Sequence, residues 1–447
     1  MTDETLGRRT YLGYALGSVG TAGFATVPGL LLAYYLTNSL GVAAAVAAVV
    51  VLLPKLWDVV FLPIVGTMSD RSAQRRRSRR PFLLVGGLLL PVVFVLTFSA
   101  PTGFGTAVSA AWVLVFFLLA ASAFAVFQVP YIAMPAEITD SVEERTTMMS
   151  WRVAFLAFGI LLFGVGAPAL RDAADGGSAG YLVMAVGVAA VIALGMLGCW
   201  WMLRRTRPVP LDVAPAPSHS LRQQFAVAWR TRPFRLLLLA FVVQALATGA
   251  MLAAAQYFAT YVMDQESLSD VLFGALIVPA LVVMPLWAWV GHRHGKRLGY
   301  LASSLVFLGG ALTLLLAPVV PSGAVLAMVA LCGVGYAGMQ MFPLALLPDT
   351  IAVDSAASGQ QRAGSFTGVW TAGETIGFAV GPALVLLMLA VTGFVSSSDG
   401  SAVQPASAET GVLLAFSLLP AVLVAASLPL ILRFRLDPVT PSLEGTS

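Results

Sequence analysis

The chain has 447 residues, of which 59% are hydrophobic and only 10% are charged. A soluble domain carries roughly 25% charged residues, so this composition excludes a soluble fold and points to lipid as the solvent. The formal net charge of +4 permits nucleic-acid binding only if the basic residues form a binding face. Cys199 and Cys332 both stand in apolar runs, so no disulfide framework is expected.

Long apolar runs recur along the whole chain, and each is about as long as a helix needs to cross ~30 Å of hydrocarbon. In chain order they lie near 11–36, 42–66, 82–100, 106–136, 147–169, 181–203, 234–262, 270–291, 299–319, 324–347, 365–393 and 411–433. This pattern predicts an all-α membrane protein with twelve transmembrane helices.

Lysine and arginine gather in the even-numbered connections between these runs, which sets the expected orientation. Six arginines lie between 71 and 80, six between 204 and 232, and three basic residues between 293 and 297. The odd-numbered connections contain a single residue of these two types, Arg171. We therefore expect a multi-pass protein of the cell membrane with both termini in the cytoplasm. The arginine run is then explained as a topogenic loop, and nucleic acid is not an expected partner.

A polar, proline-rich stretch at 204–233 is the one long polar segment between apolar runs. Its first part is typical of a linker, and its second part predicts a short amphipathic surface helix. We expect an N-terminal six-helix half at 1–203, a cytoplasmic linker at 204–233 and a C-terminal six-helix half at 234–447.

The two halves resemble each other at three places in the same order, which indicates an internal repeat. The matched segments are 62–71 with 284–293, 128–137 with 340–349, and 166–170 with 381–384. Two six-helix halves in parallel repeat are the architecture of major facilitator transporters, whose halves rock about a site near the bilayer midplane. The repeat therefore predicts two pseudo-symmetric six-helix bundles.

The string Gly-Thr-Met-Ser-Asp-Arg at 66–71, followed by further arginines, resembles the cytoplasmic motif of the major facilitator superfamily. Longer strings at 14–37, 55–72, 129–155 and 361–382 resemble the glycoside–pentoside–hexuronide:cation symporters, the group of the melibiose permease. Lysolipid symporters of eukaryotes share the same pattern. The resemblance covers nearly the whole chain.

The chain departs from that family at several acidic positions. The family's second helix carries two aspartates, four residues apart, that bind the coupling sodium or proton. The first is Asp58 here, and the second falls on Leu62. The fourth-helix aspartate that serves sugar and cation falls on Gln128, and the acidic position of the first helix falls near Ala22. Because a sodium site needs several hard oxygen ligands, these missing carboxylates favour proton over sodium coupling.

Three charged residues within the apolar runs are candidates for cation coupling, since charges inside a membrane are costly and usually functional. Asp58 lies three residues after Lys55, so they form either a structural ion pair or a site at which Asp58 binds a cation or proton. Glu374 has no base in its own run. It either takes up a proton, because desolvation favours a neutral carboxyl, or hydrogen-bonds to a neighbouring helix.

Four side chains are predicted to bind the solute. Arg152 matches the family's arginine near the substrate, with an ion pair to an acid such as Glu137 as the alternative. Gln128 offers an amide that suits sugar hydroxyls, and Tyr131 and Trp370 offer rings that stack on a sugar. Helix–helix packing is the alternative for all three.

A cytoplasmic gate is the remaining predicted site. In the superfamily motif the aspartate and arginine pair with neighbouring helix ends and latch one conformation. The resemblance places them at Asp70 and Arg71, and the charged segment after the fourth run adds Glu137 and Arg145. A solvated charged loop is the alternative for that segment.

These features predict a secondary active transporter that moves a sugar or glycoside with a cation, by alternating access. An exporter of an amphiphile such as a lysolipid or drug is the first alternative, and a non-transporting membrane sensor is the second. No Walker motif, metal-ligand spacing or nucleophile–base set is visible, so neither an enzyme nor a cofactor or metal is expected. The expected partners are a small-molecule solute, a coupling cation (H⁺ or Na⁺) and the lipid bilayer, and we expect a monomer.

Overall fold

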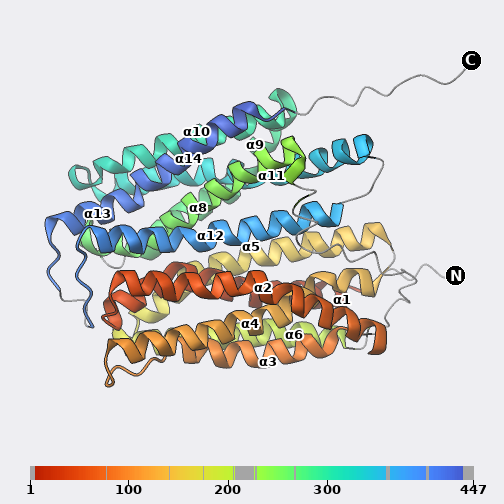
Figure 1. The fold of residues 1–447 in the computed structure, drawn as a ribbon, viewed down its shortest axis with the longest axis horizontal. Helices are drawn as coiled ribbons and strands as arrows, with labels where there is room; N and C mark the ends of the chain where they lie inside the picture. Colours follow the sequence, from red (N-terminus) through yellow and green to blue (C-terminus); the bar gives the residue numbers. More distant parts are fainter. Residues whose placement is uncertain are drawn as a thin grey trace, which may run out of the picture. The chain divides into compact units, whose positions relative to one another are not determined.

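The computed structural model describes residues 6–76, 78–139, 141–174, 176–204, 206, 226, 229–265, 268–358, 363–398 and 402–435. Every regular element within these residues is helical (Figure 1). The α-helices are α1 (Arg8–Val27), α2 (Ala44–Arg76), α3 (Arg80–Thr97), α4 (Thr106–Ile138), α5 (Val142–Asp172), α6 (Gly177–Leu203), α8 (Arg232–Tyr261), α9 (Leu268–His294), α10 (Lys296–Thr313), α11 (Ser322–Ser358), α12 (Ala363–Val391), α13 (Ala406–Phe416) and α14 (Leu418–Arg433).

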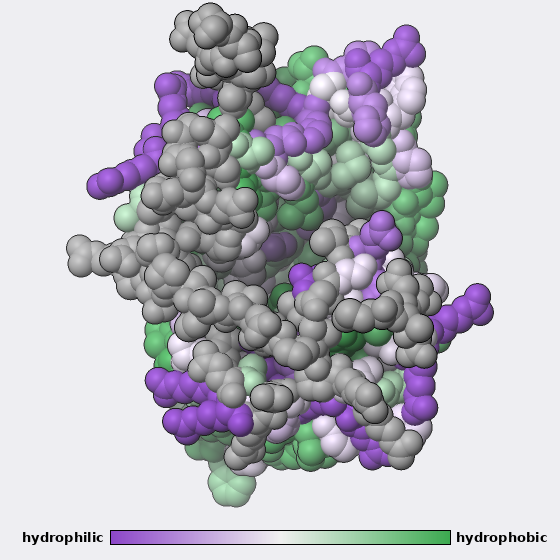
Figure 2. Space-filling model, turned by 90° about the vertical axis from the view of Figure 1, so that its right-hand side faces the viewer, coloured by the Kyte–Doolittle hydropathy of each residue, from purple (hydrophilic) through white to green (hydrophobic). Residues whose placement is uncertain are grey.

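Twelve spans long and apolar enough to cross a membrane are found within the described ranges, which confirms the predicted number. Large hydrophobic side chains point outward on many of them, among them Leu194 at 73% exposed and Val282 at 72%. Outward-facing apolar side chains are what a lipid environment requires. Figure 2 shows hydrophilic side chains around the edges of the face toward the viewer, with hydrophobic ones visible between and behind them. The protein is therefore a multi-pass membrane protein.

The helices differ from the apolar runs mainly at their ends. Helix α2 continues ten residues past the predicted end at 66, because these residues include good helix formers such as arginine, alanine and glutamine. The first span ends in two π-helical segments, Pro28–Leu32 and Tyr35–Ser39, and the last is interrupted at Ser417 between α13 and α14. Most of the predicted linker and surface helix at 204–233 lies outside the described residues.

The chain forms two compact units. Unit 1 comprises 1–214, 252–274 and 382–412, and unit 2 comprises 215–251, 275–381 and 413–447. In unit 1, α1 packs on α5 and α6, α3 on α4 and α6, and α2 on α4. In unit 2, α10 packs on α11 and α14, around an aromatic core that includes Phe241, Phe342 and Trp370. The predicted halves at 1–203 and 234–447 rest on the sequence repeat and stay a prediction.

Glycines bring helix backbones together within both units, as expected where lipid offers no hydrophobic drive for helix association. In unit 1 a Cβ added at Gly195 on α6 would lie 2.8 Å from the nitrogen of Gly20 on α1. In unit 2 a Cβ added at Gly333 on α11 would lie 2.2 Å from the carbonyl oxygen of Leu276 on α9. No side chain fits at these crossings without moving a helix.

Gly333→Ala is expected to destabilise the protein by about 1–3 kcal/mol, because the added methyl group overpacks a helix crossing against backbone. Gly309→Ala is the matched control, since Gly309 on α10 has no atom within 4 Å of the added Cβ. That substitution should be neutral or slightly stabilising. Thermal unfolding of the purified variants in detergent checks both, and equal melting temperatures would contradict the expectation.

Candidate functional site

A polar cluster in the interior of unit 1 joins α1 to α4. The hydroxyl of Tyr131 donates to the carbonyl oxygen of Tyr14 at 2.7 Å and lies 2.7 Å from the Ser18 hydroxyl. The rings of Tyr14 and Tyr131 stack with centroids 4.7 Å apart, and Phe127 lies 5.3 Å from Tyr131 on the same helix. Tyr131 is fully buried, so its ring and hydroxyl are both engaged within the protein.

Arg152 extends from α5 over this cluster. Its guanidinium carbon lies 5.8 Å from the centre of the Tyr131 ring, a cation–π distance, and its charge acts on both Tyr14 and Tyr131. The buried Nε has no hydrogen-bond partner. Within the described part of the chain no carboxylate forms an ion pair with Arg152. A half-buried guanidinium without a counter-charge is suited to bind a polar solute.

Gln128 lies one turn before Tyr131 on α4, and therefore on the same side of the helix. Its side-chain oxygen is buried and has no hydrogen-bond partner. Unsatisfied buried polar atoms are rare in native structures and each calls for a ligand, a water or a function. Gln128 and Arg152 thus leave hydrogen-bonding capacity unused beside the same tyrosine.

The other glutamines separate into two kinds. Gln244 donates from its Nε2 to the hydroxyls of Ser304 and Ser427, both at 2.9 Å, and so joins α8 to α10 and α14. Gln256, further along α8 in unit 1, is 1% exposed and has no partner for either side-chain atom. Gln244 therefore holds helices together through its amide nitrogen, although its oxygen has no partner, whereas both side-chain polar atoms of Gln256 lack one.

Asp58 and Lys55 lie on α2, as predicted. Asp58 is 6% exposed, its Oδ1 has no hydrogen-bond partner, and the charge of Lys55 acts on it. The ammonium of Lys55 lies 5.7 Å from the centre of the Phe24 ring. A buried carboxylate with one free oxygen can accept a proton or a cation, and a neighbouring cation also stabilises it as an ion.

Unit 2 holds Glu374 and Trp370 one turn apart on α12. Glu374 is half-buried, and the hydroxyl of Tyr336, which accepts a hydrogen bond from Gln340 at 3.1 Å, lies within its electrostatic reach. Trp370 stacks on Phe241 with centroids 4.5 Å apart, and its buried indole N–H has no partner. The tryptophan thus combines a packing role with an unused donor.

The predicted gate residues have different surroundings. Glu137 is buried and pairs with Arg79, whose NH1 lies 3.4 Å from its Oε2. The suggested alternative of a Glu137–Arg152 pair is therefore not formed. Arg145 donates from Nε to the carbonyl of Thr139 at 2.8 Å. Asp70 lies in α2 but its side chain is outside the described part, and Arg71 is exposed.

A hydroxyl and aromatic cluster at the opposite end of unit 1 was missed by sequence reasoning. The hydroxyls of Thr37 and Tyr257 lie 2.7 Å apart, those of Tyr34 and Thr260 lie 3.2 Å apart, and Asn38 donates to Tyr261. These bonds join the end of the first span to the end of α8. The two groups of residues are neutral and more than 200 positions apart in sequence, so no local pattern indicated that they meet.

The comparisons with known proteins agree with this architecture. The sequence model of the family described as MFS/sugar transport protein matches residues 13–438. The chain belongs to this family. The match confirms the predicted major facilitator fold and the resemblance to glycoside–pentoside–hexuronide:cation symporters, and it makes the protein a transporter rather than an enzyme.

Family relatives align along nearly their whole length. The glucuronide carrier protein homolog of Escherichia coli (strain K12) is 23% identical, with 94% of this chain and 90% of that protein covered. The isoprimeverose transporter of Lactiplantibacillus pentosus is 23% identical, with 92% and 85% covered. Among solved structures, a bacterial homolog of the human lysosomal transporter Spinster superposes with a TM-score of 0.67 at 15% identity, covering 96% of this chain and 98% of that one. That structure supports the fold alone.

Proposed function

We propose that the protein is a symporter that moves a sugar or glycoside together with a cation, by alternating access. The family match and the sugar-transporting relatives support this class. The observation that carries the proposal is the pair of unused polar groups on Arg152 and Gln128, held beside Tyr131 inside membrane-spanning helices. Polar groups at this depth are costly to keep unpaired unless a solute uses them.

Arg152 and Gln128 would donate to and accept from solute hydroxyls. Tyr131 would position the guanidinium of Arg152, since its own ring and hydroxyl are already engaged. Trp370 would add its free indole N–H as a further donor. Arginine is well suited to such a site because its planar fork donates several hydrogen bonds in a fixed geometry.

The coupling cation would be a proton taken up at Asp58 or Glu374, with Lys55 adjusting the charge of Asp58. Neither carboxyl has another acidic residue within ten positions of it in the sequence. A proton is therefore easier to accommodate than sodium, which needs several oxygen ligands. Coupling requires only that the cation binds the two conformations with different affinity.

The arginine-rich connections favour an orientation with both termini in the cytoplasm of the cell. The ion pair of Glu137 with Arg79, together with Asp70, Arg71 and Arg145, then belongs to a cytoplasmic gate. The Thr37–Tyr257 cluster belongs to the outer end of the transport path. We propose that the transporter works as a monomer.

Uptake into proteoliposomes tests this function. We expect a member of a panel of labelled glycosides, pentosides and hexuronides to accumulate when an inward proton gradient is imposed. A protonophore should abolish the accumulation, and replacing sodium by potassium should not. Transport of a lysolipid or drug without any saccharide flux would support the exporter instead, and binding without flux would support a sensor.

A further inference from the structure

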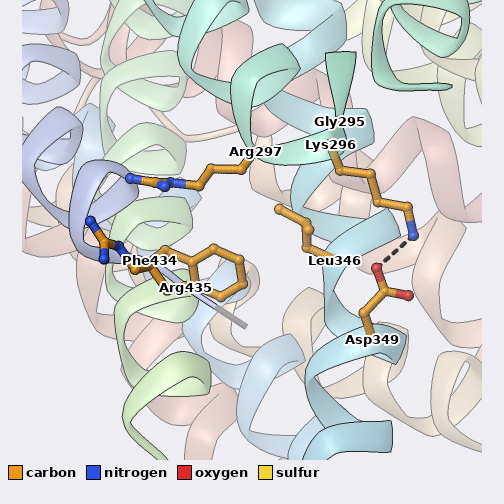
Figure 3. Close-up of a pocket in the computed structure, with 7 residues that line it drawn as sticks. All are labelled: Gly295, Lys296, Arg297, Leu346, Asp349, Phe434 and Arg435. Carbon is orange, nitrogen blue, oxygen red and sulfur yellow. Dashed lines mark hydrogen bonds and ion pairs between the residues drawn. The ribbon is translucent and has the colours of Figure 1, made fainter. Parts of the chain in front are cut away.

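A pocket of about 440 Å³ lies in unit 2, and none of the residues assigned to transport lines it (Figure 3). Three parts of the chain line it: the first turn of α10 with its preceding glycine, the C-terminal part of α11, and the two residues that follow α14. The lining residues are Gly295, Lys296, Arg297, Leu346, Asp349, Phe434 and Arg435. The proposed orientation places this pocket at the cytoplasmic surface.

The pocket is positively charged, since three cations line it against one carboxylate. Lys296 forms an ion pair with that carboxylate, since its Nζ lies 2.6 Å from Asp349 Oδ2. Among the residues that the structure describes, Arg297 donates to neutral groups, the carbonyl oxygens of Ile431 and Leu432 in the last turn of α14. The positive charges of Arg297 and Arg435 therefore have no opposing carboxylate in the lining.

Apolar side chains lie between the two charged sides. Figure 3 shows Leu346 and the ring of Phe434 between the two arginines on one side and the Lys296–Asp349 pair on the other. Both residues are 3% exposed and so belong to the packed core of unit 2. The backbone N–H groups at the start of α10 add a further preference for negative charge. The pocket thus combines a cationic rim with an apolar floor.

We propose that this pocket binds a phosphate-bearing anion, supplied by the headgroup of an anionic phospholipid of the inner leaflet. Basic pockets between helices on the cytoplasmic side are known to suit anionic headgroups. Arg435 and Arg297 would hold the phosphate oxygens through charge-assisted hydrogen bonds. Leu346 and Phe434 would contact the apolar part next to the headgroup.

Thermal unfolding of the full-length protein in detergent, titrated with phosphatidylglycerol, tests the proposal. We expect phosphatidylglycerol to raise the melting temperature and phosphatidylcholine of the same chain length not to. Arg435→Gln should raise the half-saturating lipid fraction by about fivefold, the effect of one basic residue near an anionic surface. Arg433→Gln is the matched control, because Arg433 is an exposed arginine two residues away that does not line the pocket.

A second variant predicts the opposite sign. Asp349→Asn releases Lys296 from its ion pair and removes the one lining carboxylate, so binding should tighten by about fivefold. Titration with inorganic phosphate or glycerol phosphate shows whether the bound phosphate comes from a lipid headgroup or from a soluble molecule. Stabilisation by either, lost in Arg435→Gln, would assign the site to a soluble phosphate. Equal responses of Arg435→Gln and Arg433→Gln to all probes would overturn the proposal.

Discussion

Replacing Arg152 by glutamine is expected to reduce saccharide uptake by about 10-fold to 100-fold. The substitution removes a charged donor, and hydrogen bonds to charged groups contribute roughly 1.5–3 kcal/mol. Because Arg152 has an unpaired buried Nε and no carboxylate partner in the described part of the chain, its contribution should appear in solute binding rather than in folding. Initial uptake rates over a range of solute concentrations should show the loss mainly as a higher KM.

Two further arginine variants make this expectation specific. Arg152→Lys keeps the charge but loses the planar fork, so it should recover only part of the uptake. Arg9→Gln is the matched control, because Arg9 also lies over an aromatic ring, 5.0 Å from the centre of Trp201, but is exposed. A normal KM in Arg152→Gln, or an equal loss in Arg9→Gln, would remove Arg152 from the solute site.

Replacing Glu374 by glutamine is expected to abolish proton-driven accumulation while leaving exchange of solute across the membrane. A pH gradient of one unit can support up to about tenfold accumulation in one-to-one symport, since a factor of ten corresponds to ~1.4 kcal/mol. Glutamine keeps the shape of the side chain and its capacity to form hydrogen bonds, but it cannot take up and release a proton. Accumulation driven by an imposed pH gradient and counterflow at equal pH should be measured in the same proteoliposomes.

Asp58→Asn tests whether Asp58, rather than Glu374, takes up the coupling proton. It leaves the ammonium of Lys55 without its acidic neighbour inside the membrane, which should lower stability as well as coupling. The double variant Lys55→Met, Asp58→Asn should regain stability, and it regains coupling only if the pair is structural. Glu409→Gln, an exposed carboxyl at the start of α13, serves as the control. Proton-driven accumulation that persists in Glu374→Gln would exclude Glu374 as the coupling site.

The sequence by itself determined the twelve spans, because hydrocarbon demands about twenty apolar residues in each helix whatever the helix packs against. It also determined the family, since the strings around Asp58, Gln128 and Arg152 carry motifs that depend on chain order alone. Helix ends were less certain, and α2 extends into arginines that no hydropathy pattern assigns to a helix.

Only the tertiary structure decided which polar side chains have partners. Hydropathy and spacing treat Gln128, Gln244 and Gln256 alike, yet the amide nitrogen of Gln244 donates to two serines while both side-chain atoms of Gln256 and the oxygen of Gln128 have no partner. The partner of Glu137 proved to be Arg79, 58 positions earlier, in a run that sequence reasoning explained by topology alone. Helical periodicity determines which residues share a face of one helix. The neighbouring helix that meets that face determines which of them remain free to bind a solute.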